Sequence, residues 1–252
     1  MNQNENAIEV RGVSKFYNLY ERPQDRVKEL FSLTKKKSHT LYKALDQVSF
    51  TVKKGETLGI IGRNGAGKST LASVVCGLAR EQRGSIEIDG AVLSARKRLP
   101  LSYEVMQEAN HQLFCDSVEE EVVLGASNPG TRGLESVLGQ LDLLDVRGRH
   151  PLTLSGGQKQ RCAIAAAMFC GKKVLVFDEP TGGLDYAHMA QTATLLRELA
   201  ASGAFVLVVT HDFELALAAC DRVTEMKGGK VTAQYGLDKG GVARLREFFG
   251  IG

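Results

Sequence analysis

Short apolar runs alternate with stretches of helical spacing along most of the chain. Residues 57–62, 173–180 and 204–212 are almost continuously apolar, a pattern typical of strands buried on both faces of a parallel sheet. Residues 69–79 and 188–202 instead carry apolar positions three and four apart, which predicts helices. Strands and helices in this order predict an α/β fold with a parallel core sheet.

Other segments alternate apolar and polar positions, as strands with one solvated face do. Residues 8–17 and 45–52 alternate in this way, and residues 85–90 form a third candidate strand that ends in an Asp-Gly turn. These early strands predict an antiparallel layer added to the parallel core. A Gly-Gly pair within residues 222–234 predicts a hairpin, and the spacing over residues 134–146 predicts a further helix.

Residues 18–41 are predicted to be an insertion between the first two strands. Val27, Leu30 and Phe31 have helical spacing, and a run of three lysines follows at residues 35–37. One interpretation is a solvated basic loop. The other is a small amphipathic helix that contacts a partner or a membrane surface.

Composition narrows the class of protein without naming its function. The chain has 252 residues, of which 43% are apolar, and a net charge of +3, too small to argue for nucleic-acid binding. Its five cysteines include no Cys-x-x-Cys pair, which argues against a disulfide framework or a zinc site and for reduced, packed thiols. We expect no signal peptide and no membrane span, because no basic and apolar leader and no run of about 18 apolar residues is present.

The segment GRNGAGKS at residues 62–69 fits the phosphate-binding P-loop pattern in full, between a predicted strand and a predicted helix. Its glycines let backbone N–H groups surround phosphate oxygens, and the helix N-terminus adds a favourable dipole. Lys68 is expected to reach the outer phosphates, and the Ser69 hydroxyl to ligate Mg²⁺. The expected nucleotide contacts are Gly62, Asn64, Gly65, Ala66, Gly67, Lys68, Ser69 and Thr70.

Two consecutive carboxylates come directly after the apolar residues 174–177, within the segment 173–180. Asp178 ends that strand and is therefore expected at the sheet edge beside the P-loop, where it would hold the water shell of Mg²⁺. Glu179 comes next and would face the γ-phosphate, where a carboxylate can position and deprotonate the attacking water.

The motifs together resemble those of ATP-binding cassette (ABC) ATPases. The P-loop, LSGGQ at residues 154–158, VLVFDEPTGGLD at residues 174–185 and a Thr-His pair after a late strand follow in the order of that family. The resemblance covers roughly residues 8–235. It implies one cassette domain over residues 1–252, a P-loop NTPase fold with a parallel core sheet, an antiparallel β subdomain and a helical signature subdomain at roughly residues 108–170.

The resemblance also explains why one chain carries two glycine-rich helix starts. In such ATPases two cassettes pack head to tail, and the LSGGQ element of one covers the ATP held by the P-loop of the other. A chain with one of each must pair with itself or with a similar subunit. The residues expected to cap the neighbour's γ-phosphate are Ser155, Gly156, Gly157 and Gln158. One departure from the family pattern is Gly182, where serine is usual.

Further roles are implied residue by residue. Gln107 resembles the glutamine that senses Mg²⁺ and the attacking water. Asp185 resembles the aspartate that links the two sites, and His211 the histidine that contacts the γ-phosphate. Tyr17 resembles the aromatic residue that stacks on adenine, and Tyr42 is the competing candidate.

Two subfamilies are similar to different parts of the chain. The first 65 or so residues resemble ATPases that export polysaccharides or teichoic acids. Residues from about 66 to 235, including HQLFCDSVEEEVVLG at residues 111–125, resemble ATPases of energy-coupling factor (ECF) transporters, which take up vitamins and metal ions in prokaryotes. The longer match favours uptake. Export is the first alternative, and a soluble cassette of the iron–sulfur assembly type is a second.

The resemblance implies ATP and Mg²⁺ as cofactors and ATP hydrolysis coupled to transport. It also implies a second cassette and an integral membrane subunit as partners, with no nucleic acid. The chain is then expected at the cytoplasmic face of a prokaryotic membrane, held there through its membrane partner.

Overall fold

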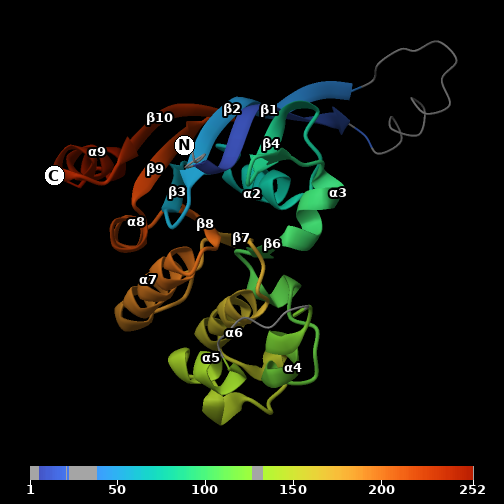
Figure 1. Ribbon diagram of the computed structural model, residues 1–252, viewed down its shortest axis with the longest axis vertical. Helices are drawn as coiled ribbons and strands as arrows, with labels where there is room; N and C mark the ends of the chain where they lie inside the picture. Colours follow the sequence, from blue (N-terminus) through green and yellow to red (C-terminus); the bar gives the residue numbers. More distant parts are fainter. Residues whose placement is uncertain (1–5, 21, 23–38, 127–132, 252) are drawn as a thin grey trace, which may run out of the picture.

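The computed structural model describes residues 6–20, 22, 39–126 and 133–251. Two sheets lie above a group of helices (Figure 1). The α/β fold expected from the apolar pattern is confirmed. The helix expected around residues 27–31 lies outside the described residues.

The larger sheet has the strand order β10-β9-β3-β8-β7-β6, and neighbours pair in parallel except for β10, which is antiparallel to β9. Its strands are β3 (Thr57–Gly62), β6 (Ser102–Val105), β7 (Val174–Asp178), β8 (Phe205–Thr210), β9 (Arg222–Lys227) and β10 (Lys230–Gly236). Every residue of β3, β7 and β8 is buried, which explains their continuous apolar runs. Along β8, Val206 and Val208 face one core while Leu207 and Val209 face the other.

The smaller sheet is antiparallel, with the order β2-β1-β4-β5. Its strands are β1 (Asn6–Tyr20), β2 (His39–Lys53), β4 (Arg83–Ile88) and β5 (Ala91–Val92). Helix α2 (Lys68–Cys76) lies between the two sheets, and its Leu71 and Val75 share one core with Val10 of β1 and Leu207 of β8. The expected antiparallel layer is therefore present, and it covers one face of the parallel sheet.

The first and last residues of the expected insertion belong to this sheet. Leu19 pairs with Thr40, and Tyr20 pairs with His39, so that β1 and β2 continue as a ladder beyond residues 17 and 42. The rings of Tyr20 and His39 lie 5.6 Å apart. The insertion therefore begins and ends as paired strand rather than as loop.

Helices fill the stretch between β6 and β7. They include α4 (Val118–Val123), α5 (Leu134–Gln140) and α6 (Gly156–Phe169) and lie at the opposite end of the molecule from the antiparallel sheet (Figure 1). The helix expected over residues 134–146 is shorter than predicted. It ends at Gln140 because Asp142 has a φ of 51°, a left-handed backbone that an α-helix cannot contain, and residues 144–146 form a 3₁₀ turn.

The remaining α-helices of the described residues are α3 (Ala95–Arg98), α7 (Tyr186–Ala201), α8 (Phe213–Ala219) and α9 (Lys239–Phe249). Helix α7 was expected, whereas β6, α8 and α9 were not identified from the sequence. All five cysteines are free thiols, and four of them are buried. Within the described ranges no helix is both long and apolar enough to cross a bilayer.

The loop before α2 is held by the distant β9–β10 turn and by strand β2. The turn between β9 and β10 is the expected Gly-Gly pair, and the Gly229 amide donates to the Ala66 carbonyl at 3.0 Å. The Gly229 carbonyl in turn accepts from the Asp46 amide of β2 at 2.8 Å. Gly67 has a φ of 95°, and a Cβ there would lie 2.5 Å from the Ala44 carbonyl oxygen. Only glycine fits this crossing without moving β2.

We expect Gly67→Ala to destabilise the protein more than Gly65→Ala. Both positions have positive φ, so each substitution costs about 1 kcal/mol in backbone strain. At Gly65 a Cβ meets nothing within 4 Å, whereas at Gly67 it must displace Ala44, which adds roughly 1–3 kcal/mol. Urea unfolding of both variants measures the difference, and equal free energies of unfolding would contradict the close approach of β2.

Candidate functional site

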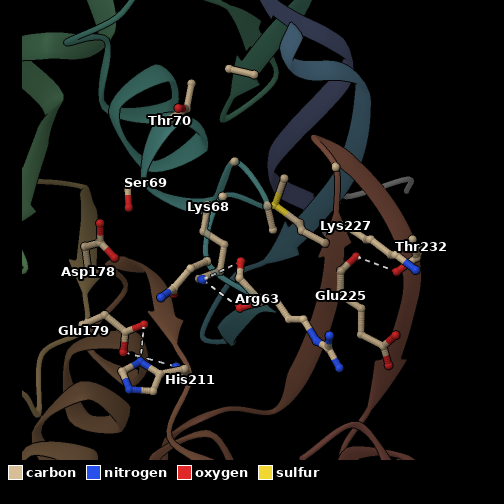
Figure 2. Close-up of a pocket in the computed structure, with 18 of the residues that line it drawn as sticks. Arg63, Lys68, Ser69, Thr70, Asp178, Glu179, His211, Glu225, Lys227 and Thr232 are labelled. Atoms are coloured by element: carbon tan, nitrogen blue, oxygen red, sulfur yellow. Dashed lines mark hydrogen bonds and ion pairs between the residues drawn. The ribbon is translucent and has the colours of Figure 1, made fainter. Parts of the chain in front are cut away.

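The candidate site is an open pocket of about 1420 Å³ at the carboxyl ends of the parallel strands. Such edges are where open α/β sheets bind ligands. Figure 2 shows Asp178, Glu179 and His211 on one side of Lys68, with Glu225, Lys227 and Thr232 on the other. Twelve expected residues line this pocket: Gly62, Asn64, Gly65, Ala66, Gly67, Lys68, Ser69, Thr70, Gln107, Asp178, Glu179 and His211.

The loop at residues 62–67 presents a cation and a helix N-terminus to the pocket. Helix α2 begins at Lys68 with Gly67 as its N-cap, and no side chain caps its first amides. Those amides therefore remain free to bind an anion. The buried Lys68 ammonium donates to the Gly62 carbonyl at 2.8 Å, which places its charge inside the loop. The arrangement suits a phosphate chain.

Asp178 and Ser69 provide oxygen ligands beside this loop. Burial raises the pKa of the Asp178 carboxyl, and the Glu179 charge raises it further, while a hydrogen bond from the Ser69 hydroxyl and the Lys68 charge oppose this. Gln107 is exposed and lines the same pocket. A carboxylate, a hydroxyl and an amide oxygen are hard donors of the kind that Mg²⁺ prefers, so these residues fit that ion.

Glu179 and His211 contact each other in the pocket (Figure 2). Glu179 has a φ of 52°, and its amide donates to the Val209 carbonyl at 2.9 Å. Its carboxylate accepts from the Thr210 hydroxyl at 3.3 Å and the His211 amide at 3.2 Å, and lies 2.7 Å from the His211 Nδ1. Glu179 is buried, whereas the His211 side chain is 72% exposed. A fixed carboxylate is thus aimed into an open pocket, as a general base requires.

Glu104 is a nearby acid that the sequence did not reveal. It lies on β6, which pairs with β7 and so brings the acid toward Asp178. Burial and the Asp178 charge raise the pKa of Glu104 to about 7, against a hydrogen bond from Ser73. The segment SYEV has only four residues, too few for its pattern to mark a strand, so neither β6 nor its acid was recognised.

The structure separates the two candidate adenine-stacking residues. Tyr42 lines the pocket, and Tyr17 is not among the lining residues. The two are paired across the β1–β2 ladder, but β2 is the edge strand and lies between β1 and the pocket. The Tyr17 ring instead lies under the Lys15 ammonium, 5.1 Å from its centroid. The pocket therefore favours Tyr42 over Tyr17, since the loop approaches β2.

Apart from Arg63 of the P-loop, the far side of the pocket comes from segments that carried no site signal in the sequence. Besides Tyr42, the residues that sequence reasoning did not assign to the site are Ala44, Arg63, Glu225, Met226, Lys227, Gly228, Thr232, Phe248 and Phe249. The Gly-Gly pair predicted the hairpin but not its contact with the P-loop. Helix α9, which supplies the two phenylalanines, was not predicted at all.

The LSGGQ residues lie outside this pocket, together with Asp185. Ser155 caps α6 in a capping box: its hydroxyl accepts from the Gln158 amide at 3.3 Å, and the Gln158 side chain accepts from the Ser155 amide at 3.0 Å. Ser155 and Gly156 are exposed. A Cβ on Gly157 would lie 3.3 Å from the Gly183 carbonyl, so this helix start and the turn before Asp185 are neighbours. They form a second surface, which we call the signature surface (residues 155–158 and 182–185).

Comparison with known proteins agrees with this geometry. The sequence model described as ABC transporter matches residues 45–182. A Treponema denticola protein named as an ABC transporter ATP-binding protein is 45% identical over 202 residues, covering 80% of this chain and 41% of the relative. The cobalt import ATP-binding protein CbiO of Rhodobacter capsulatus is 42% identical over 206 residues, covering 76% of this chain and 72% of that protein.

Solved structures give the same fold. The dimeric, post-hydrolysis structure of the ATP-binding cassette MJ0796 bound to ADP and Pi has a TM-score of 0.75 and 26% identity, and the match covers 92% of this chain and 99% of that one. CbiO1 of Clostridium perfringens, described as part of the ABC transporter complex cbiONQ, has a TM-score of 0.71 and 26% identity over 98% of this chain and 92% of that one.

This chain spans only about two fifths of the Treponema relative, so that relative has length beyond the matched cassette. The family match nevertheless covers more than half of the chain and includes the P-loop, the LSGGQ element and the two carboxylates at the end of β7. This chain belongs to the ABC transporter family, as an ATP-binding cassette.

Proposed function

We propose that this chain binds and hydrolyses ATP as one of a pair of cassettes and thereby powers an ABC transporter through a membrane subunit. The observation that carries the proposal is the fixed Glu179 carboxylate in the pocket of the phosphate-binding loop. A nucleotide-binding module without chemistry would not need a buried, oriented base beside the γ-phosphate position.

Nucleotide binding uses groups that already face the pocket. The amides at the start of α2 and the Lys68 ammonium receive the phosphates. Ser69, Gln107 and Asp178 would hold Mg²⁺, which when bound would neutralise charge on the phosphate oxygens. Tyr42 offers its ring to adenine at the β2 side of the pocket.

Hydrolysis is assigned to Glu179 and His211. Glu179 accepts a proton from the water that attacks the γ-phosphorus, and the bond to the β-phosphate oxygen breaks to give ADP and phosphate. The Thr210 hydroxyl and the His211 amide keep the carboxylate in place. As an imidazolium, His211 can donate from Nδ1 to the Glu179 carboxylate and from its exposed Nε2 to the γ-phosphate.

Each cassette supplies half of two sites in this proposal. Ser155, Gly156, Gly157 and Gln158 cap the γ-phosphate held by the other cassette, and Asp185 links the two sites. Support comes from the exposed helix start at Ser155 and from the dimeric ATP-binding cassette among the similar structures. The partner cassette is a second copy or a similar subunit.

We further propose ECF-type uptake of a vitamin or metal ion, with the chain held peripherally at the cytoplasmic face of a prokaryotic membrane. The likeness to the cobalt import protein CbiO supports this choice. The loop after Gln107 carries Phe114, whose 73% exposure leaves an apolar ring for a membrane subunit to contact. Polysaccharide export stays the alternative, on the resemblance of the first 65 residues.

We expect Glu179→Gln to lower ATP turnover by roughly 10²–10⁴-fold, because the amide cannot accept the water proton. ATP binding should persist, so a stable, ATP-bound pair of cassettes should accumulate. Phosphate release and light scattering with ATP measure the two effects. Glu119→Gln is the control, because this half-exposed acid pairs with Arg147 at 2.8 Å and does not line the pocket. Turnover at the parental rate in Glu179→Gln would place the base elsewhere.

We expect Tyr42→Ala to raise the Kd for ATP about tenfold, since stacking of a base on an aromatic ring contributes roughly 1–3 kcal/mol. Tyr17→Ala is the matched control and should change the Kd by less than about twofold. Titration calorimetry with ATP and with inorganic triphosphate separates base from phosphate contacts. A larger loss of ATP affinity in Tyr17→Ala than in Tyr42→Ala would instead assign adenine stacking to Tyr17 of β1.

We expect the full chain, captured from mild-detergent membranes of its host, to bring down two kinds of membrane protein: a small substrate-binding protein and a separate coupling subunit. Mass spectrometry of the captured chains identifies them. Phe114→Asp should lose both, because a charge replaces the exposed ring. Capture of a single polytopic export permease would overturn the uptake assignment while leaving the ATPase assignment standing.

A further inference from the structure

Two side chains on one face of helix α7 contact Asp185, which is its N-cap, and the turn at the end of α5. His188 and Gln191 are three residues apart and so lie side by side. The His188 Nδ1 lies 2.8 Å from Asp185 Oδ1, and its Nε2 lies 3.7 Å from Asp142 Oδ2. The Gln191 side-chain amide donates to the Gln140 carbonyl. One helix face therefore contacts its own N-cap and the turn that follows α5.

The other side of that turn is held by the helix that carries LSGGQ. Arg161 of α6 is buried, and its Nε donates to the Leu141 carbonyl at 2.8 Å. Asp142 has the left-handed φ of 51° that ends α5. The turn at residues 140–142 is thus clamped between α6 and α7, and a continuous path of contacts runs from Arg161 to Asp185.

The start of α6 and the turn before Asp185 also meet directly. Leu184 and the Gly183 carbonyl lie 3.4 and 3.3 Å from the position of a Cβ on Gly157. The signature surface is therefore connected twice within one chain: by contact across Gly157, and through the 140–142 turn and His188. In the proposed pairing, both segments of this surface, residues 155–158 and residues 182–185, face the second cassette.

The chemistry of His188 suits a bridge between two carboxylates. Its side chain is 26% exposed, while those of Asp142 and Asp185 are 65% and 66% exposed. The His188 amide, and then its imidazole, hold the pKa of Asp185 below its usual value, so this carboxylate stays charged. An imidazolium can donate from Nδ1 to Asp185 and attract the Asp142 carboxylate across the longer 3.7 Å ion pair. Exposed ion pairs add little to global stability, so a role in position rather than in stability fits this bridge.

We propose that His188 is a positioning residue: it fixes Asp185 relative to the LSGGQ helix, so that both ends of the signature surface meet the second cassette together. The inference rests on the proposed pairing of cassettes. Breaking the bridge should leave ATP binding by one cassette unchanged, because no residue of the bridge lines the nucleotide pocket. It should weaken the ATP-driven pairing.

The test uses the full chain carrying Glu179→Gln, so that hydrolysis does not dissolve the pair. Sedimentation with ATP gives the dimer dissociation constant, calorimetry at low protein concentration gives the ATP affinity, and thermal unfolding gives Tm. Adding His188→Ala should weaken pairing about tenfold, with ATP affinity and Tm unchanged. Asp142→Asn should act in the same direction, and the combined variant should lose no more than His188→Ala alone.

Thr194→Ala is the matched control, because Thr194 is exposed on the same helix and its hydroxyl donates to the Ala190 carbonyl of that helix. It should pair like the Glu179→Gln parent. Parental pairing by His188→Ala, or an equal loss of ATP affinity, would overturn the positioning role. Absence of ATP-driven pairing in the parent itself would instead overturn the proposed function and this inference with it.

Discussion

Parallel pairing in the core sheet is the constraint on which the site depends. Ile61 of β3 pairs with Thr210 of β8, and Asp178 of β7 pairs with Val209, so strands far apart in the sequence end at one edge. Because all three strands are buried on both faces, their interior positions are apolar, and Asp178 and Thr210 lie where β7 and β8 stop. The phosphate loop, the two carboxylates and His211 meet there as a consequence of the pairing.

The sequence pattern predicts what is local, and it misses what depends on strand order. The apolar runs locate β3, β7 and β8, and the P-loop pattern locates the start of α2, since each signal lies within a few residues. The contribution of Tyr42 rather than Tyr17 depends instead on β2 being the edge strand nearest the loop. The closeness of Glu104 to Asp178 likewise depends on the pairing of β6 with β7. Helix α5 stops early in a turn that meets α6 through the Leu141 carbonyl and α7 through Asp142, and no local pattern records these contacts.

The exposed start of α6 remains able to bind a phosphate although it is already capped. Ser155 uses its hydroxyl oxygen as the acceptor for Gln158 and its backbone amide as the donor to the Gln158 side chain. A serine hydroxyl is both a donor and an acceptor, so its proton is still available. The first amides of α6 have no carbonyl partner within the helix. The capping box therefore orients the Ser155 hydroxyl and leaves its donor free for an anion.

The left-handed backbone at Glu179 lets two consecutive acids, Asp178 and Glu179, line the same pocket. Consecutive side chains of a strand point to opposite faces of the sheet, so a regular continuation of β7 would direct Glu179 away from Asp178. Both residues nevertheless line the pocket. The φ of 52° produces this reversal, at a cost of roughly 1–3 kcal/mol for a non-glycine residue. Hydrogen bonds from the Glu179 amide to Val209, and from Thr210 and His211 to its carboxylate, offset that cost. Glycine would adopt the turn with less strain but would have no carboxylate, so the strained residue is the one that the chemistry requires.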